Sequence, residues 1–345
     1  MKEFRTQSVS SQFLHFSLLH FFIFHFFIFS FFNSLTFKMP ILNNFEQTLL
    51  AITVPSYAFI ILLEIFLSNY YGQKNMYSVK DTVTNLIMTL LNASLDGMMR
   101  FFTLLMLNKC FEFRFFNTEA LKLSSPIIYW SLVVIGWEFM FYWLHRLEHS
   151  SRFFWATHST HHSSEHYNLS VGFRSSVFEP LFRFVFFLPL SFLGIEPLDF
   201  FLIYSVTQIY GLLVHTQYVG RIPVWEWFFV TPAHHRVHHA SNIPYLDKNM
   251  GMFLIVWDRI FGTFAEEMPN VKTEYGLLKK EKLNNPLDVI FYEWRNIFSD
   301  VKRRDLNLQT KLNYIFKAPG WSHDGSSKTA IQLQNELNDR VEANK

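Results

Sequence analysis

Histidine is concentrated in two short stretches of this chain, and a fold that uses both must bring them together. Residues 142–167, YWLHRLEHSSRFFWATHSTHHSSEHY, contain six of the fifteen histidines, and residues 231–242, TPAHHRVHHASN, contain four more. His145 and His149 are four apart, and two further groups follow the pattern H-x-x-H-H. Residues three or four apart share a helix face, where neutral imidazoles can reach one transition metal ion. The sequence therefore predicts three pieces of a metal site.

The number of clustered histidines indicates two metal ions. A zinc site is complete with four protein ligands, or three and a water, so eight histidines exceed what one such ion can use. Because most single histidines are not ligands, the alternative is a chance cluster of surface or core residues. Three clusters in helical register argue against that alternative. The eight are His145, His149, His158, His161, His162, His235, His238 and His239.

Long apolar blocks predict an integral membrane protein. The 345 residues are 50% hydrophobic and 19% aromatic, and runs of spanning length cover residues 47–70, 82–107 and 125–147. The formal net charge of +2 gives no indication of a nucleic acid partner. The lone Cys110 excludes an intramolecular disulfide framework, so the metal site must be based on histidine.

Charged residues fall inside these runs. Asp96 and Arg100 are four apart, a spacing that lets them pair with each other rather than face lipid singly. Glu138, His145 and His149 are separated by seven and four residues and therefore share a helix face. Glu138 would either orient a ligand imidazole through a hydrogen bond or be satisfied by a neighbouring helix.

A helical hairpin supplies a ninth ligand. Residues 177–195 and 198–216 are apolar and are joined only by Glu196 and Pro197, which predicts two antiparallel helices that return the chain to its starting side. His215 then lies at the foot of the second helix, near the three clusters. Residues 251–264 are apolar but too short to span, so we expect them to pack against the metal-binding segments or lie at the surface.

We expect four regions along the chain. Residues 1–38 are a phenylalanine-rich segment, either an extra span or an extension upstream of a start at Met39. Residues 39–124 form membrane helices, residues 125–267 the catalytic domain, and residues 268–345 a polar tail that is loosely ordered from about Ser326. The basic residues of this tail predict a cytoplasmic site by the positive-inside rule, with Lys109, Arg114 and Lys122 as the count against it.

Three kinds of chemistry suit a histidine-rich site at a membrane surface. A di-iron centre would activate dioxygen and oxidise an unactivated C–H bond of a lipid. Metal transport is the alternative from another class, but transport sites lie near the bilayer midplane, whereas these histidines follow helix ends. Zinc-dependent hydrolysis is disfavoured because the H-E-x-x-H motif is missing from the sequence.

The ordered motifs also carry a family resemblance. HRLEH, HSTHH, His215 and HRVHH resemble the histidine boxes of the fatty acid hydroxylase and sterol desaturase superfamily of membrane di-iron enzymes. FYWLHRLEH, ATHSTHHSSEHYNLS, TPAHHRVHH and DKNMGMFLIVWDRIFGTF look most like the alkylglycerol monooxygenase branch. The resemblance covers roughly residues 129–267.

This resemblance implies two iron ions, with the eight clustered histidines and His215 as ligands and His234 and His166 as further candidates. His166 stands where the branch has an acidic residue, and Ser150 where many relatives have Glu. It also implies an external reductant, either a cytochrome b5-like or ferredoxin-type carrier or tetrahydrobiopterin. The sequence contains no haem, flavin or iron–sulfur motif of its own.

The sequence thus predicts an all-α, polytopic membrane helical bundle of five or six embedded helices with a cytoplasmic, histidine-rich di-iron cap. The expected membrane is a bacterial inner membrane or the endoplasmic reticulum. The expected function is O2-dependent hydroxylation of a lipid C–H bond, including ether cleavage by way of a hemiacetal. Desaturation of a sterol or acyl lipid is the alternative within the same chemistry.

Overall fold

The computed structural model describes residues 44–73, 75–279, 283 and 285–343, and over these residues it is all-helical. Backbone pairing of the β type is confined, among these residues, to the isolated bridges Phe229–Leu254 and Ala240–Tyr275. The all-α prediction is therefore confirmed. Residues 1–38 lie outside the described residues. Contacts divide the chain into two compact units, residues 1–63 and 64–345, and the packing below concerns the second.

Among the residues that the structure describes, three helices are long and apolar enough to cross a membrane. They are α2 (Asn44–Tyr70), α3 (Val79–Glu112) and α5 (Pro126–Ser150), and their apolar stretches match the predicted runs. At 1.5 Å per residue, the 25 residues of α5 rise about 37 Å, more than the roughly 30 Å of a bilayer core. The helices support a membrane protein, while the predicted number of crossings stays a prediction.

The hairpin forms, but its first helix is shorter than predicted. The 3-10 turn η2 (Glu179–Leu181) precedes α7 (Arg183–Phe192), and α8 (Pro197–Leu213) follows. Pro180 lies within η2, where its ring and missing N–H oppose an α-helix beginning at residue 177. Ten residues of α7 rise only about 15 Å, so α7 enters a bilayer no more than halfway.

Aromatic packing holds this hairpin against α5. The Trp137 side chain is 1% exposed, and its ring stacks on Phe187 of α7 at 4.2 Å between centroids. Phe200 of α8 meets the same indole edge-on at 5.1 Å. One buried cluster therefore joins α3, α5, α7 and α8, with Leu107, Val133 and Leu190 among its members.

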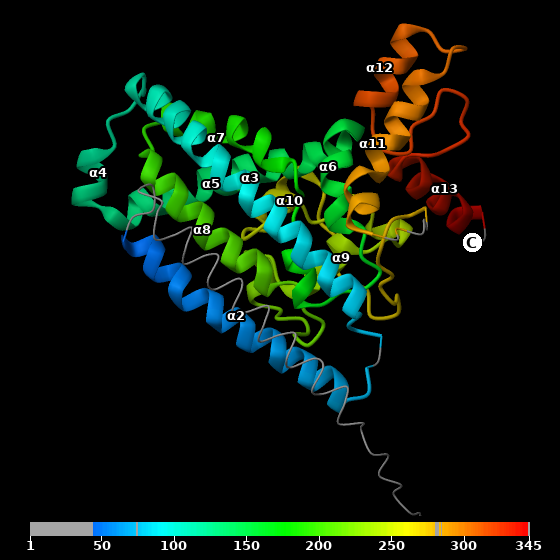
Figure 1. Cartoon of the computed structure of the whole chain (residues 1–345), viewed down its shortest axis with the longest axis horizontal. Helices are drawn as coiled ribbons and strands as arrows, with labels where there is room; N and C mark the ends of the chain where they lie inside the picture. Colours follow the sequence, from blue (N-terminus) through cyan, green and yellow to red (C-terminus); the bar gives the residue numbers. More distant parts are fainter. Residues whose placement is uncertain (1–43, 74, 280–282, 284, 344–345) are drawn as a thin grey trace, which may run out of the picture. The chain divides into compact units, whose positions relative to one another are not determined.

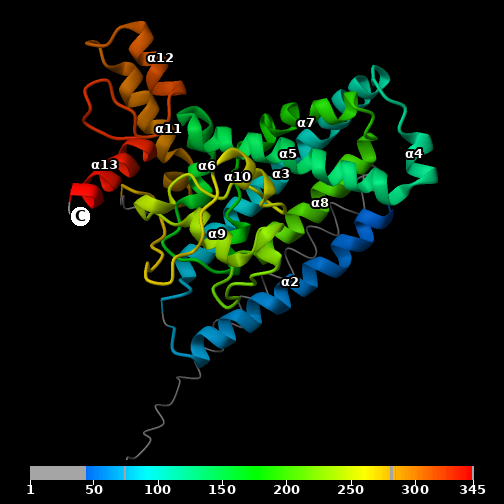
Figure 2. The ribbon, with the colours of Figure 1, turned by 180° about the vertical axis from the view of Figure 1, so that it is seen from behind.

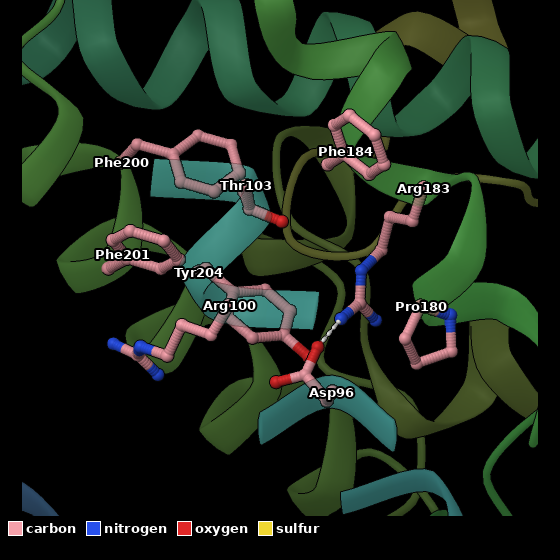
Figure 3. Close-up of a pocket in the computed structure, with 9 residues that line it drawn as sticks. All are labelled: Asp96, Arg100, Thr103, Pro180, Arg183, Phe184, Phe200, Phe201 and Tyr204. Carbon is pink, nitrogen blue, oxygen red and sulfur yellow. Dashed lines mark hydrogen bonds and ion pairs between the residues drawn. The ribbon is translucent and has the colours of Figure 1, made fainter. Parts of the chain in front are cut away.

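Ion pairs also join α3 to the hairpin. The predicted partner of Asp96 was Arg100, but the structure pairs it with another residue. The Asp96 carboxylate pairs with Arg183, which also reaches Glu179 at 3.3 Å. Figure 3 shows this pair beside Phe184, and the Arg100 guanidinium lies 4.3 Å from the centre of the Phe201 ring. A contact with the distant residue Arg183 could not be read from helical spacing alone.

Short helices complete the structure at both ends of α3 and α5. Figures 1 and 2 place α4 at the opposite end from α6, α9 and the C-terminal helices. The remaining elements are α4 (Glu119–Ser124), α6 (Arg152–His162), η1 (Leu169–Phe173), η3 (Trp225–Trp227), α9 (Pro232–His239), η4 (Ile243–Tyr245) and α10 (Val256–Phe261). The segment at residues 251–264 packs against the histidine-bearing helices α5 and α9, through Trp257 on Phe139 and Phe264 on His234, as expected.

The prediction of a loosely ordered C-terminal tail is wrong. The chain forms α11 (Pro286–Lys302), α12 (Leu308–Phe316) and α13 (Ala330–Ala343). Thr329 and Gln332 form a capping box at the start of α13, where the Thr329 amide donates to Oε1 of Gln332 at 2.9 Å. Gln334 donates to the carbonyls of Ile243 and Leu246, which docks α13 on η4. The capping pair was readable in the sequence, but the docking was not.

Removing the indole at the centre of the hairpin contact should destabilise the fold. We expect Trp137→Ala to lower the thermal midpoint in detergent sharply, since emptying a buried aromatic site costs about 3–5 kcal/mol. Leu132→Ala, at a position 55% exposed on the same helix, is the matched control. Equal midpoints for the two variants would show that Trp137 does not hold the hairpin.

Candidate metal centre

Four segments deliver nine histidines to one buried region. The last turns of α5 carry His145 and His149, α6 and α9 carry three each, and His215 follows the end of α8. The nine include the ninth ligand that the hairpin was expected to supply. His161 is half-buried, and the other eight are buried.

The nine histidines fall into two groups in which the candidate ligand atoms lie within 4.8 Å of one another. Group A contains His145, His149, His158, His162 and His238. Group B contains His161, His215, His235 and His239. Two groups are what two metal ions require, although iron ligation by these residues stays a prediction.

Each H-x-x-H-H motif is divided between the two groups. In α6, His158 and His162 are four apart and join group A, while His161 joins group B. In α9 the assignment is reversed, because His235 and His239 join group B and His238 joins group A. The i, i+4 pairs therefore share a site, and the middle histidine of each helix reaches across to the other. Spacing alone did not predict this exchange.

Backbone carbonyls fix the tautomers of four rings. The Nδ1 atoms of His145 and His215 lie 2.7 Å from the carbonyls of Met250 and Gly211. Those of His161 and His238 lie 3.0 Å from the carbonyls of residues 174 and 248. Since a carbonyl only accepts hydrogen bonds, each Nδ1 carries the proton and each Nε2 carries a lone pair.

These lone pairs point at one another, which fits a bound cation. Nε2 of His215 lies 3.4 Å from Nε2 of His161, and both rings have their proton on Nδ1. Nε2 of His149 and of His238 is buried without a hydrogen-bond partner in the described structure. Converging acceptors without a proton between them repel unless a positive ion lies among them. The donor set therefore fits metal ions that favour imidazole, such as iron or zinc.

Burial keeps these imidazoles neutral. Loss of hydration lowers the pKa of His158, His162 and His215 well below the usual value, and neighbouring imidazoles lower it further. Burial also lowers the pKa of His161 to about 4. The unprotonated form that binds metal is thus the stable form at neutral pH.

Two carboxylates near the rings were not predicted. Oε2 of Glu148 lies 3.3 Å from Nδ1 of His158, and Oδ1 of Asp247 lies 3.2 Å from Nδ1 of His149. Carboxylates in this position orient metal-ligating imidazoles and raise their basicity. Glu148 was visible inside the HRLEH motif, but its neighbour is on the next helix. Asp247 adopts the left-handed conformation, with φ of 54°, and no sequence motif predicted this turn.

Glu138 acts on the centre through a loop. Its Oε2 atom accepts hydrogen bonds from the amides of Phe253 and Leu254 at 2.8 and 3.0 Å. The same loop presents the Met250 carbonyl to His145, and Asp258 holds it by accepting from the amides of Met250 and Gly251. The Glu138 carboxylate thus holds the loop whose carbonyl orients the His145 ring. It neither bonds the ring directly nor is merely satisfied by a neighbouring helix, the two roles that were predicted.

His234 and His166 lie outside both groups. Nδ1 of His234 accepts from the Thr231 amide at 3.4 Å as part of the capping box of α9. Nδ1 of His166 lies 2.9 Å from the carbonyl of Asn75. The structure therefore assembles the nine principal candidates and leaves these two apart.

Arg174 connects the membrane helix α3 to group B. Its guanidinium donates to Asp81 and Asn85 of α3 at 3.0 and 2.7 Å, and to the carbonyl of Thr160 in α6 at 2.9 Å. The backbone carbonyl of Arg174 accepts a hydrogen bond from Nδ1 of His161. The side chain is 3% exposed, so these bonds replace its hydration. Sequence patterns gave no signal for this residue.

Loss of the Arg174 guanidinium should weaken group B. We expect Arg174→Gln to reduce metal affinity about 10- to 100-fold, as for other residues that orient metal ligands. Arg174→Lys, which keeps the charge without the fork, should retain more metal. Metal content after graded chelation measures the effect, and Arg303→Gln at an exposed ion pair is the control. Unchanged metal retention in Arg174→Gln would contradict the assignment.

Known proteins share this arrangement of motifs. Residues 130–263, which contain all nine histidines, match the fatty acid hydroxylase family. The alkylglycerol monooxygenase of Homo sapiens is 36% identical over 226 residues, covering 66% of this chain and 48% of the relative. That of Xenopus tropicalis is 35% identical over 218 residues, covering 62% and 46%. That of Danio rerio is 34% identical over 273 residues, covering 78% and 58%.

The chain therefore spans about half the length of the curated relatives it matches. No solved structure matches it. The fatty acid hydroxylase family is iron-dependent, in agreement with the all-nitrogen donor set. Residues 130–263 are thus similar to the fatty acid hydroxylase family, and the chain is similar to the alkylglycerol monooxygenases.

Proposed function

We propose that this protein is a membrane di-iron oxygenase that hydroxylates a lipid C–H bond with O2, with an alkylglycerol as its substrate. The observation that carries the proposal is the convergence of nine imidazoles into two groups at the end of an apolar helix of spanning length. A hydrolytic zinc site needs three protein ligands and a water, whereas each group here offers at least four imidazoles.

Two iron ions held by groups A and B would supply the chemistry that activates O2 and oxidises an unactivated C–H bond. The protein holds the ligand rings in one orientation through the carbonyls of Met250 and Gly211. Two aromatic rings pack against the centre. The ring centroids of Trp155 and His149 are 5.2 Å apart, and those of Tyr167 and His239 are 5.4 Å apart.

The proposed reaction balances with an external reductant. One oxygen atom is inserted into the C–H bond next to the ether oxygen, and the other leaves as water after uptake of two electrons and two protons. The resulting hemiacetal breaks its C–O bond to give a fatty aldehyde and glycerol. We propose tetrahydrobiopterin as the donor, because the resemblance of the sequence motifs to the alkylglycerol monooxygenase branch implies this reductant. A cytochrome b5-like or ferredoxin-type carrier is the alternative to be tested beside it.

Protein produced in iron-replete cells should hold two iron ions per chain. The expectation follows from two separate groups, each with enough nitrogen donors for one ion. Elemental analysis of the purified protein measures it, and His166→Ala should keep both ions because His166 lies outside the groups. One ion per chain, or zinc in place of iron under these conditions, would argue for a hydrolase or a transport protein.

The purified protein should convert a 1-O-alkylglycerol to a fatty aldehyde and glycerol with uptake of O2. His215→Ala should abolish this activity while the protein still inserts in membranes, because the loss of a ligand exceeds the roughly 10- to 100-fold cost of losing a residue that only orients one. Aldehyde detection with a pterin and with a protein donor separates the two reductants. An unsaturated product would indicate a desaturase, and full activity in His215→Ala would remove this residue from the ligands.

A further inference from the structure

Large apolar side chains are exposed beside the metal centre in a segment too short to span a membrane. Val224 is 78% exposed, Trp225 58%, Trp227 64% and Phe228 61%, and Ile260 of α10 is 61% exposed. These five residues are called the η3–α10 patch below. Five exposed residues of this size in two neighbouring short segments are unusual for a surface in contact with water.

The fold holds these side chains outward. Glu226, between the two tryptophans, is 4% exposed and accepts hydrogen bonds from the amide of Ile222 and from both Nε and Nη2 of Arg221 at 2.9 to 3.0 Å. Its burial directs Trp225 and Trp227 away from the interior. The amide of Ile255 donates to the carbonyl of Phe228 at 3.0 Å, which ties η3 to the segment before α10.

The patch continues an apolar stripe of the candidate span α5. Ile128, Leu132, Ile135 and Trp143 are all exposed and follow one helix face. At the end of this stripe, Phe139 meets Trp257 at 5.0 Å and Trp143 meets Phe261 at 5.0 Å, both on α10. The exposed face of a spanning helix is covered by lipid, and here it runs without interruption into α10.

Cationic side chains flank the aromatic part of this surface. The Arg146 guanidinium lies 5.4 Å from the Trp143 ring, and the Arg259 guanidinium lies 5.1 Å from the Trp227 ring. Arg221, with a side chain 40% exposed, borders η3. Tryptophan beside arginine is typical of the level at which lipid headgroups meet acyl chains.

From this continuity we infer that the η3–α10 patch is inserted into the bilayer as an interfacial anchor. Its occupant is lipid rather than a partner protein, because the patch shares one surface with the exposed stripe of α5 and carries the aromatic and cationic residues of a membrane interface.

The anchor has a consequence for the metal centre. The amide of Val230, next to η3, donates to the carbonyl of Phe253, and the Phe253 amide is held by Glu138. The same loop presents the Met250 carbonyl to His145. The inserted patch is therefore connected through this loop to the carbonyl that orients His145 in group A.

Site-directed quenching tests the inference without reference to catalysis. In a Cys110→Ala background, Phe228→Cys carries an environment-sensitive fluorophore, and the full chain is reconstituted in phosphatidylcholine vesicles. Ser327→Cys, exposed in the loop before α13, is the matched control. Lipids with a nitroxide near the top of the acyl chain should quench the label at 228 severalfold more than aqueous iodide does. The control should show the opposite order.

A label at residue 228 that iodide quenches as strongly as it quenches the control would overturn the inference, and the patch would then be free for a protein partner. A second label at Val224→Cys, the most exposed position, guards against a local effect of the Phe228 substitution. The assay reports bilayer depth only. Failure of the proposed oxygenase activity would therefore leave the result standing, and the reverse also holds.

Discussion

Unprotonated imidazole nitrogens facing one another in a buried space are the constraint on which this structure depends. Nε2 of His215 lies 3.4 Å from Nε2 of His161, and the carbonyls of Gly211 and Arg174 hold the proton of each ring on Nδ1. Such a cluster is stable only with compensating positive charge, because burial disfavours protonating the rings and repulsion disfavours leaving them empty. A pair of metal cations satisfies both conditions.

The surrounding structure is organised to keep that cluster rigid. Helices α6 and α9 each give two histidines to one group and one to the other, so neither group can move independently of its neighbour. Four backbone carbonyls from three segments accept hydrogen bonds from Nδ1 of the rings and so fix their orientation. Arg174 and the loop held by Glu138 and Asp258 connect these carbonyls to the membrane helices α3 and α5. Orientation at the metal centre is therefore tied to the packing of the apolar bundle.

The membrane helices explain why such a centre would act on lipid. His145 and His149 occupy the last turns of a helix whose earlier turns are apolar and long enough to cross a bilayer. The centre consequently lies near the end of a span, where a lipid headgroup and the first carbons of its chain are found. The proposed oxidation of a C–H bond next to an ether oxygen fits this position, because such a bond lies close to the lipid headgroup.

The sequence by itself determined the helical class, the three long apolar helices and the nine clustered histidines, because hydrophobic length and ligand spacing are local properties. It failed where contacts are distant along the chain: Asp96 pairs with Arg183, Gln334 docks α13 on η4, and Glu148 lies beside His158. Only the tertiary structure decided which histidines share a group, which carbonyl sets each tautomer, and that Arg174 joins α3 to His161. Helical periodicity places a side chain on a face, but the identity of the partner across that face depends on how separate segments pack.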